Sequence, residues 1–233
     1  MIGKRGLRIS RSKTESLRMN TEDTAAVKMD GVGIPDVSQF KYLGSTIDRE
    51  GGCEADVQKR IGNAWAKWRS LKGVMCDKRM PNRLKGKVYR TCIRPVMLYG
   101  SEAWPIRKVE ERKLGTTEMR MLRWSTGKTM LDRVPNEKTR KLLQVRPIDE
   151  KVRERRMRWF GHVERRDEQY AGKLADQIKP DGKRRRGRPQ QRWDDNVKAD
   201  LKFLGLTRED AQDRAKWRKL TCMADPRSTS PSR

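Results

Sequence analysis

The strongest candidates for binding chemistry in this sequence are cations gathered at residues 183–189. Five of these seven residues are Lys or Arg, and guanidinium groups pair well with phosphate oxygens. In an Arg-Gly-Arg-Pro core of the AT-hook type, two arginines follow the narrow minor groove of A·T-rich DNA, the glycine permits close approach and the proline keeps the backbone extended. A basic linker that contacts phosphates without sequence preference, or a nuclear import signal, explains the same composition. The residues concerned are Lys183, Arg184, Arg185, Arg186, Gly187, Arg188 and Pro189.

Residues of the types that form catalytic or metal centres are scattered. The chain has a single Asp-Asp pair, Asp194-Asp195, on an expected helix, and a single histidine, His162, which we expect to pack or to cap a helix. A structural zinc site needs four N or S ligands, usually with two of them close in sequence. We therefore expect no metal, no cofactor, no enzymatic activity in this chain as it stands, and reduced thiols. The four cysteines are Cys53, Cys76, Cys92 and Cys222.

The composition limits both the core and the partners. Among 233 residues, 57 Lys and Arg outweigh 31 acids, for a net charge of +26, while apolar residues make up only 34%. We therefore expect small helical modules joined by basic segments, and a polyanion as the partner. Nucleic acid is the default polyanion, and an anionic membrane surface is the weaker alternative. No apolar run resembles a signal peptide or a membrane span, so an intracellular location, nuclear or cytoplasmic, is expected.

The elements that must position these residues change type near residue 53. Alternation predicts a strand around residues 16–19, a hairpin that turns at Asp30-Gly31, and a second strand over residues 40–47. From Glu54 onward apolar residues recur every three or four positions, which predicts helices. The expected helices start at Glu54, near Pro81 (kinked at Pro95), at about Glu110, at Asn136, at Pro147, near Trp193, and after a Thr207–Asp210 capping box.

These patterns predict a mainly α protein with a short N-terminal β-hairpin. We expect a β segment at 1–52, a helical bundle at 53–128, a helical segment at 129–166, a basic linker at 167–189, a small C-terminal helical module at 190–222 and a disordered tail at 223–233. Helical spacing assigns most of the seven tryptophans to module cores. For Trp124 and Trp159, each of which follows an arginine, a surface role is the alternative.

Several motifs, taken in order, resemble the C-terminal part of the endonuclease-reverse transcriptase of a non-LTR (LINE-type, RTE-like) retrotransposon. The two N-terminal motifs are GLRISRSKTE at 6–15 and FKYLGS at 40–45. The likeness continues through YGSEAW at 99–104, EMRMLRW at 118–124, RWFGHV at 158–163, GRP at 187–189, RW at 192–193 and DRAKWR at 213–218.

This resemblance implies a palm end with a primer-side hairpin at 1–52 and a helical thumb at 53–128. It places Lys13 near the incoming nucleotide, where a solvated loop lysine is the alternative. It also makes residues 40–44 a primer-side contact, for which simple packing is the alternative. The implied nucleic-acid contacts outside 183–189 are Lys13, Phe40, Lys41, Tyr42, Leu43 and Gly44, to which the basic residues of the first thumb helix, Lys59, Arg60, Lys67 and Arg69, are added.

The chain departs from this family in one respect that concerns catalysis. The aspartates that hold two metal ions in a reverse transcriptase belong to a motif upstream of Gly6, and Asp194-Asp195 does not match it. We therefore expect a fragment that contacts an RNA template and a DNA primer but does not polymerise, with no small-molecule substrate and no membrane partner. A DNA-binding accessory or domesticated protein that uses residues 183–189, and an inert retroelement remnant, remain alternatives.

Overall fold

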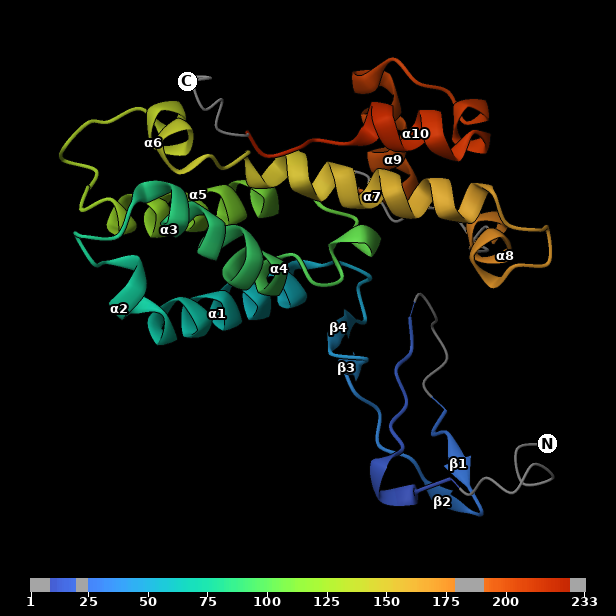
Figure 1. The fold of residues 1–233 in the computed structure, drawn as a ribbon. Coiled ribbons are helices and arrows are strands. Elements are labelled where there is room, and N and C mark those ends of the chain that lie inside the picture. Colours follow the sequence, from blue (N-terminus) through green and yellow to red (C-terminus); the bar gives the residue numbers. More distant parts are fainter. Residues whose placement is uncertain (1–8, 20–24, 179–190, 227–233) are drawn as a thin grey trace. The chain divides into compact units, whose positions relative to one another are not determined.

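The computed structural model describes residues 9–19, 25–178 and 191–226, and the chain divides into two units, Met1–Asp56 and Val57–Arg233 (Figure 1). The first contains short strands and the second contains almost all of the helix. The prediction of a mainly α protein with a short N-terminal β part is therefore confirmed.

The first unit contains two antiparallel hairpins and a 3₁₀ turn, η2 (Arg11–Lys13). Strands β1 (Lys28–Met29) and β2 (Val32–Gly33) are joined through Asp30 and Gly31, whose φ angles of 52° and 80° are those of a type I′ turn. The hairpin predicted at Asp30-Gly31 is confirmed. The strand predicted at residues 16–19 is wrong, since this segment forms a single bridge between Ser16 and Asp36.

The second hairpin corrects the single strand predicted over residues 40–47. Strand β3 (Gln39–Tyr42) pairs with β4 (Ser45–Asp48), with Phe40 opposite Ile47. The chain reverses because Leu43 and Gly44 both have positive φ, 47° and 86°. Leucine is uncommon in this conformation, and the sequence here lacks the Asn-Gly or Asp-Gly pair that usually marks a two-residue turn.

The second unit is a helical assembly that begins within the first helix. Its first half contains α1 (Glu54–Ser70), α2 (Lys72–Met75), α3 (Asn82–Val88), the π-helical turn η3 (Tyr89–Ile93), α4 (Arg94–Met97), η4 (Ser101–Ala103) and α5 (Lys108–Ser125). Its second half contains α6 (Asn136–Leu143), α7 (Ile148–Glu164), α8 (Ala171–Gln177), α9 (Trp193–Leu204), η5 (Glu209–Gln212) and α10 (Arg214–Thr221).

The helix expected between Pro81 and Tyr99 is interrupted just before Pro95. Pro95 has no backbone N–H to offer the carbonyl four residues earlier. The turn just before it widens into η3, and α4 continues beyond it. This interruption agrees with the predicted kink at Pro95.

The turn η3 and helices α5 and α6 enclose a polar centre on Glu118, which is fully buried. The Tyr89 hydroxyl donates to Glu118 Oε1 at 3.0 Å, and the Arg140 Nη2 atom donates to Oε2 at 2.8 Å. The α3–α6 contact also requires a glycine, because a Cβ on Gly86 would lie 1.8 Å from the Leu143 carbonyl oxygen. These contacts fix the part of the unit on which α7 begins.

A second core joins α7 to the C-terminal helices (Figure 1). The sequence pattern predicts a separate module at residues 190–222, whereas Val197, Leu201 and Trp217 pack with Met157 and Phe160 of α7 in one cluster. Arg156 of α7 also donates to Asp200 of α9 at 2.7 Å, with both side chains buried. The sequence pattern indicated the apolar faces of these helices but not the helix that covers them.

Two further segments differ from their expected character. Helix α8 occupies part of the expected linker 167–189, where Ala171 and Leu174 favour helix. Within the expected tail 223–233, the strap formed by residues 223–226 is bonded to the helices. Asp225 accepts two hydrogen bonds from Arg94 and one from the Arg146 backbone N–H.

Candidate functional site

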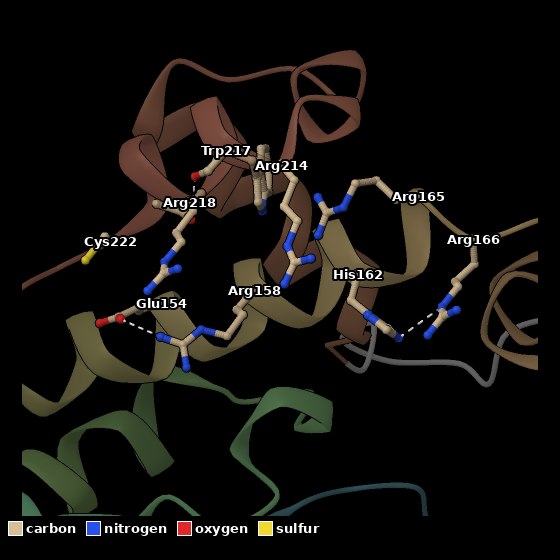
Figure 2. Close-up of a pocket in the computed structure, with 10 residues that line it drawn as sticks. Glu154, Arg158, His162, Arg165, Arg166, Arg214, Trp217, Arg218 and Cys222 are labelled. Atoms are coloured by element: carbon tan, nitrogen blue, oxygen red, sulfur yellow. Dashed lines mark hydrogen bonds and ion pairs between the residues drawn. The ribbon is translucent and has the colours of Figure 1, made fainter.

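A basic groove of about 810 Å³ lies between α7 and α10 (Figure 2). Five arginines and a histidine contribute to its walls, against one carboxylate. The residues that line it are Glu154, Arg158, His162, Arg165, Arg166, Arg214, Trp217, Arg218, Thr221 and Cys222.

Helix α7 supplies the longer wall of the groove. Arg158, His162, Arg165 and Arg166 are spaced by four, three and one residues, which brings them to one side of a helix with 3.6 residues per turn. The rise of about 1.5 Å per residue spreads these side chains over about 12 Å. The wall therefore presents a row of three arginines with a histidine among them, and not a single charged point.

Helix α10 supplies the opposite wall, and its start is fixed by Asp213. The Asp213 carboxylate accepts from the backbone N–H groups of Ala215 and Lys216 at 2.9 and 3.0 Å, so it caps the helix. The capping box expected to start this helix lies at the start of η5 instead, where Asp210 accepts from the Thr207 backbone N–H at 2.9 Å.

Arg214 and Arg218 project from α10 at i and i+4, toward α7 (Figure 2). Both are exposed. In the described part of the chain, no carboxylate pairs with either of them. They are therefore free to bind an anion from solution.

The two walls are held at close range by Gly161 and Trp217. The buried Trp217 ring donates from Nε1 to the Met157 carbonyl oxygen of α7 at 2.9 Å. A Cβ on Gly161 would lie 2.3 Å from that Nε1 atom, closer than real Cβ contacts allow. Glycine at this position therefore lets α10 settle against α7 and sets the width of the groove.

The charges of the groove are only partly neutralised from within. Glu154, the one carboxylate of the lining, accepts from Arg158 at 2.9 Å and also from Lys151. Arg165 donates to the Ala211 carbonyl oxygen at 2.6 Å. Burial, together with the positive charge of Arg214, lowers the pKa of Arg165 from its usual value. Cations that repel one another in this way favour a bound anion.

His162 connects the groove to an aromatic surface. It is partly exposed, its ring stacks on Trp159 with centroids 5.5 Å apart, and its Nε2 atom accepts from Arg166 at 3.4 Å. The histidine packs, as the sequence analysis expected, but it does so at the wall of the groove and not in a core.

The candidate residues of the first unit lie in two places. Lys13 is exposed at the end of η2. Residues 40–44 form one edge and the turn of the second hairpin, where Phe40 is partly buried and Lys41 is exposed. Tyr42 and Leu43 are 57% and 75% exposed, which leaves the turn that ends at Gly44 accessible to a ligand.

The candidate residues of α1 do not form one patch. Arg60 is buried and its guanidinium lies 4.4 Å from the centroid of the Tyr99 ring, so it contributes to packing. Lys59 is partly exposed, while Lys67 and Arg69 are exposed. Two residues of separation on a helix turn Lys67 and Arg69 about 200° apart. The basic cluster Lys183, Arg184, Arg185, Arg186, Gly187, Arg188 and Pro189 lies outside the described residues.

The sequence pattern does not predict the groove as a site, although three of its five arginines lie in two of the motifs described above. RWFGHV at 158–163 contributes Arg158, Gly161 and His162, and DRAKWR at 213–218 contributes Arg214, Trp217 and Arg218. The i, i+4 spacing of Arg158 and His162, and of Arg214 and Arg218, was the available signal. Nothing in the spacing alone indicates that the two motifs face each other.

The described residues hold no group of three or more His, Cys, Asp or Glu side chains arranged for a metal ion. Asp194 instead pairs with Lys198 at 2.6 Å, and Asp195 accepts from the Arg192 backbone N–H at the start of α9. The four cysteines are free thiols. No helix among the described residues has the length and apolarity needed to cross a membrane.

Comparison with known proteins gives two informative similarities. The chain is 27% identical over 205 residues to a putative uncharacterized transposon-derived protein of Caenorhabditis elegans, covering 84% of this chain and 73% of that protein. It is 31% identical over 84 residues to a probable RNA-directed DNA polymerase from transposon BS of Drosophila melanogaster. That match covers 36% of this chain but only 9% of the polymerase.

No protein-family profile matches the chain, and no solved structure matches it. The two similarities agree in kind with the resemblance seen in the sequence motifs, because both relatives are transposon proteins by name. The relationships of this chain are therefore to transposon-derived proteins, one of which is a probable polymerase.

Proposed function

We propose that this chain is a nucleic-acid-binding protein of retroelement origin, and that the groove between α7 and α10 holds the phosphate backbone. The observation that carries the proposal is the charge of the groove, where five arginines from two helices surround a single carboxylate. The similarity to transposon-derived proteins, one of them a probable RNA-directed DNA polymerase by name, supports the same class of ligand.

Arginine binds a phosphate through its geometry as well as through its charge. Its planar guanidinium donates two parallel hydrogen bonds to a phosphate and stays protonated at any physiological pH. Rows of arginines on two facing helices can contact several successive phosphates of one strand. Binding of this kind positions a nucleic acid without reading its sequence.

The resemblance of the sequence motifs supports a more specific proposal. We assign the chain to the C-terminal part of a non-LTR reverse transcriptase, where it contacts template and primer and contributes binding without catalysis. The exposed Tyr42 and Leu43 at the turn of the second hairpin support a primer-side contact, because apolar side chains at a hairpin tip gain from covering a base or sugar.

The proposal is tested by a salt titration of the full chain on duplex DNA. The double variant R214A/R218A removes two exposed cations that have no carboxylate partner in the described part of the chain. If each contacts one phosphate, the slope of log K against log salt should flatten by about 1.8, from about 0.9 per phosphate. The affinity should fall on all duplex sequences alike.

The matched control is R83A/R112A, which removes two exposed arginines that do not line the groove. An equal loss in this control would show that binding is spread over the whole cationic surface, and the groove assignment would fail. R186A/R188A tests the AT-hook alternative, since a hook predicts a selective loss on A·T-rich duplexes.

A further inference from the structure

We propose that the groove takes a single strand in preference to a duplex, with Trp159 as the platform on which an unpaired base stacks. This inference rests on the proposed function, because it assumes that the arginines of the groove hold phosphates. It adds the class of nucleic acid and assigns a role to an aromatic side chain that does not line the groove itself.

Trp159 lies where a core residue does not. It follows Arg158 on α7 and remains 37% exposed, whereas its neighbour Phe160 is 2% exposed within the core shared with α10. One large aromatic residue of this pair therefore holds the helices together. The other offers an apolar surface to solvent beside a row of cations.

The Trp159 ring continues the groove through His162. The two rings stack at a centroid distance of 5.5 Å with an interplanar angle of 23°, and His162 also lines the groove. Tyr170 meets His162 edge-on at 6.0 Å, and the Arg166 guanidinium lies 5.4 Å from the centroid of the Tyr170 ring. Aromatic rings and arginines thus lie together along α7 and at the start of α8.

This alternation matches the chemistry of an unpaired strand. In a duplex the faces of the bases are covered by their neighbours, so a protein reaches mainly phosphates and base edges. In a single strand each base can swing out and stack on an aromatic or guanidinium plane while the adjacent phosphate pairs with a cation. Contact with duplex phosphates alone would leave the exposed face of Trp159 at the edge of the groove without a base to stack on.

The test compares W159A with the unchanged chain on two DNA ligands of about 20 nucleotides, an unstructured single strand and the duplex of the same sequence, by fluorescence anisotropy. W159A should weaken single-strand binding about tenfold and leave duplex binding within about twofold, as expected for the loss of one stacked base. W159F, which keeps an aromatic face, should recover most of the loss. The salt slope should not change, because no cation is removed.

The control is W124A, since Trp124 is similarly exposed, at 45%, but packs in a separate cluster with Trp65 and Trp68. An unchanged single-strand affinity in W159A, an equal loss on both ligands, or the same loss in W124A would overturn the inference. The R214A/R218A variant keeps the two proposals distinguishable. If it still flattens the salt slope while W159A has no effect, only the single-strand inference fails.

Discussion

Replacing Gly161 with alanine should destabilise the helical unit, although alanine is the better helix former. In an open helix interior, Gly-to-Ala substitution stabilises by about 1 kcal/mol. Here the new Cβ would stand 2.3 Å from Nε1, 2.6 Å from Cδ1 and 2.9 Å from Cε2 of the Trp217 ring. That ring is 2% exposed within a packed core, so it cannot move aside without displacing its neighbours.

The magnitude follows from three contributions. Overpacking costs about 1–3 kcal/mol. Displacement of the Trp217 ring also breaks its hydrogen bond to the Met157 carbonyl and leaves a buried donor unpaired, at about 1–3 kcal/mol. After subtraction of the gain of about 1 kcal/mol in helix propensity, the expected net loss is about 1–5 kcal/mol.

The assay is urea unfolding followed by far-UV circular dichroism, with Gly62 as the matched position. Gly62 lies in the interior of α1, and a Cβ added there would meet nothing within 4 Å, so G62A should raise the unfolding free energy by up to about 1 kcal/mol. The two alanines should therefore act with opposite sign. A G161A protein as stable as the parent chain, or stabilised like G62A, would refute the proposed close approach of α10 to α7.

Two further predictions concern other contacts of the helical unit. G86A should cost about 3 kcal/mol or more in the same unfolding assay, because its Cβ would meet the Leu143 backbone at 1.8 Å and backbone cannot rotate away; a loss below that of G161A would contradict this ranking. Asp225 gives a pH dependence: burial would raise its pKa, but the hydrogen bonds from Arg94 outweigh burial and hold the pKa below the usual 3.8. Its contribution is present above that value and is lost as the pH falls through the lower folded-state pKa, so the stability difference between the parent chain and D225N should shrink in acid. A difference that stays constant from about pH 6 to about pH 2 would show that the Arg94–Asp225 pair does not stabilise the fold.

The sequence was most informative where local chemistry decides the structure. The apolar repeat that predicted the first helix placed Val57, Ala64 and Trp68 on one face, and all three are buried. The same holds for the hairpin at Asp30-Gly31, whose residue types prefer positive φ. The turn at Leu43-Gly44 is harder to predict, because leucine rarely adopts a positive φ such as the 47° that it has here.

The candidate site was less accessible to sequence reasoning because it depends on long-range packing. Arg158 and Arg214 each lie in a motif described above, yet they share a groove because α10 packs on α7, where Gly161 leaves room for the Trp217 ring. Conversely, Arg60 satisfies the pattern of a surface cation on α1, but its guanidinium is used over Tyr99. Charge in a sequence shows how much positive potential is present, and packing decides which part of it faces a ligand.

The separation of the two walls along the chain has a consequence during synthesis. The Met157 carbonyl and the Trp217 ring that bonds to it are 60 residues apart. At about 5–20 residues per second, the arginines of α7 leave the ribosome about 3–12 s before those of α10. During that interval Trp217 of α10 is not yet present to pack on Gly161 and Phe160. Early contact between the α7 row and a nearby RNA would then compete with docking of α10 during synthesis.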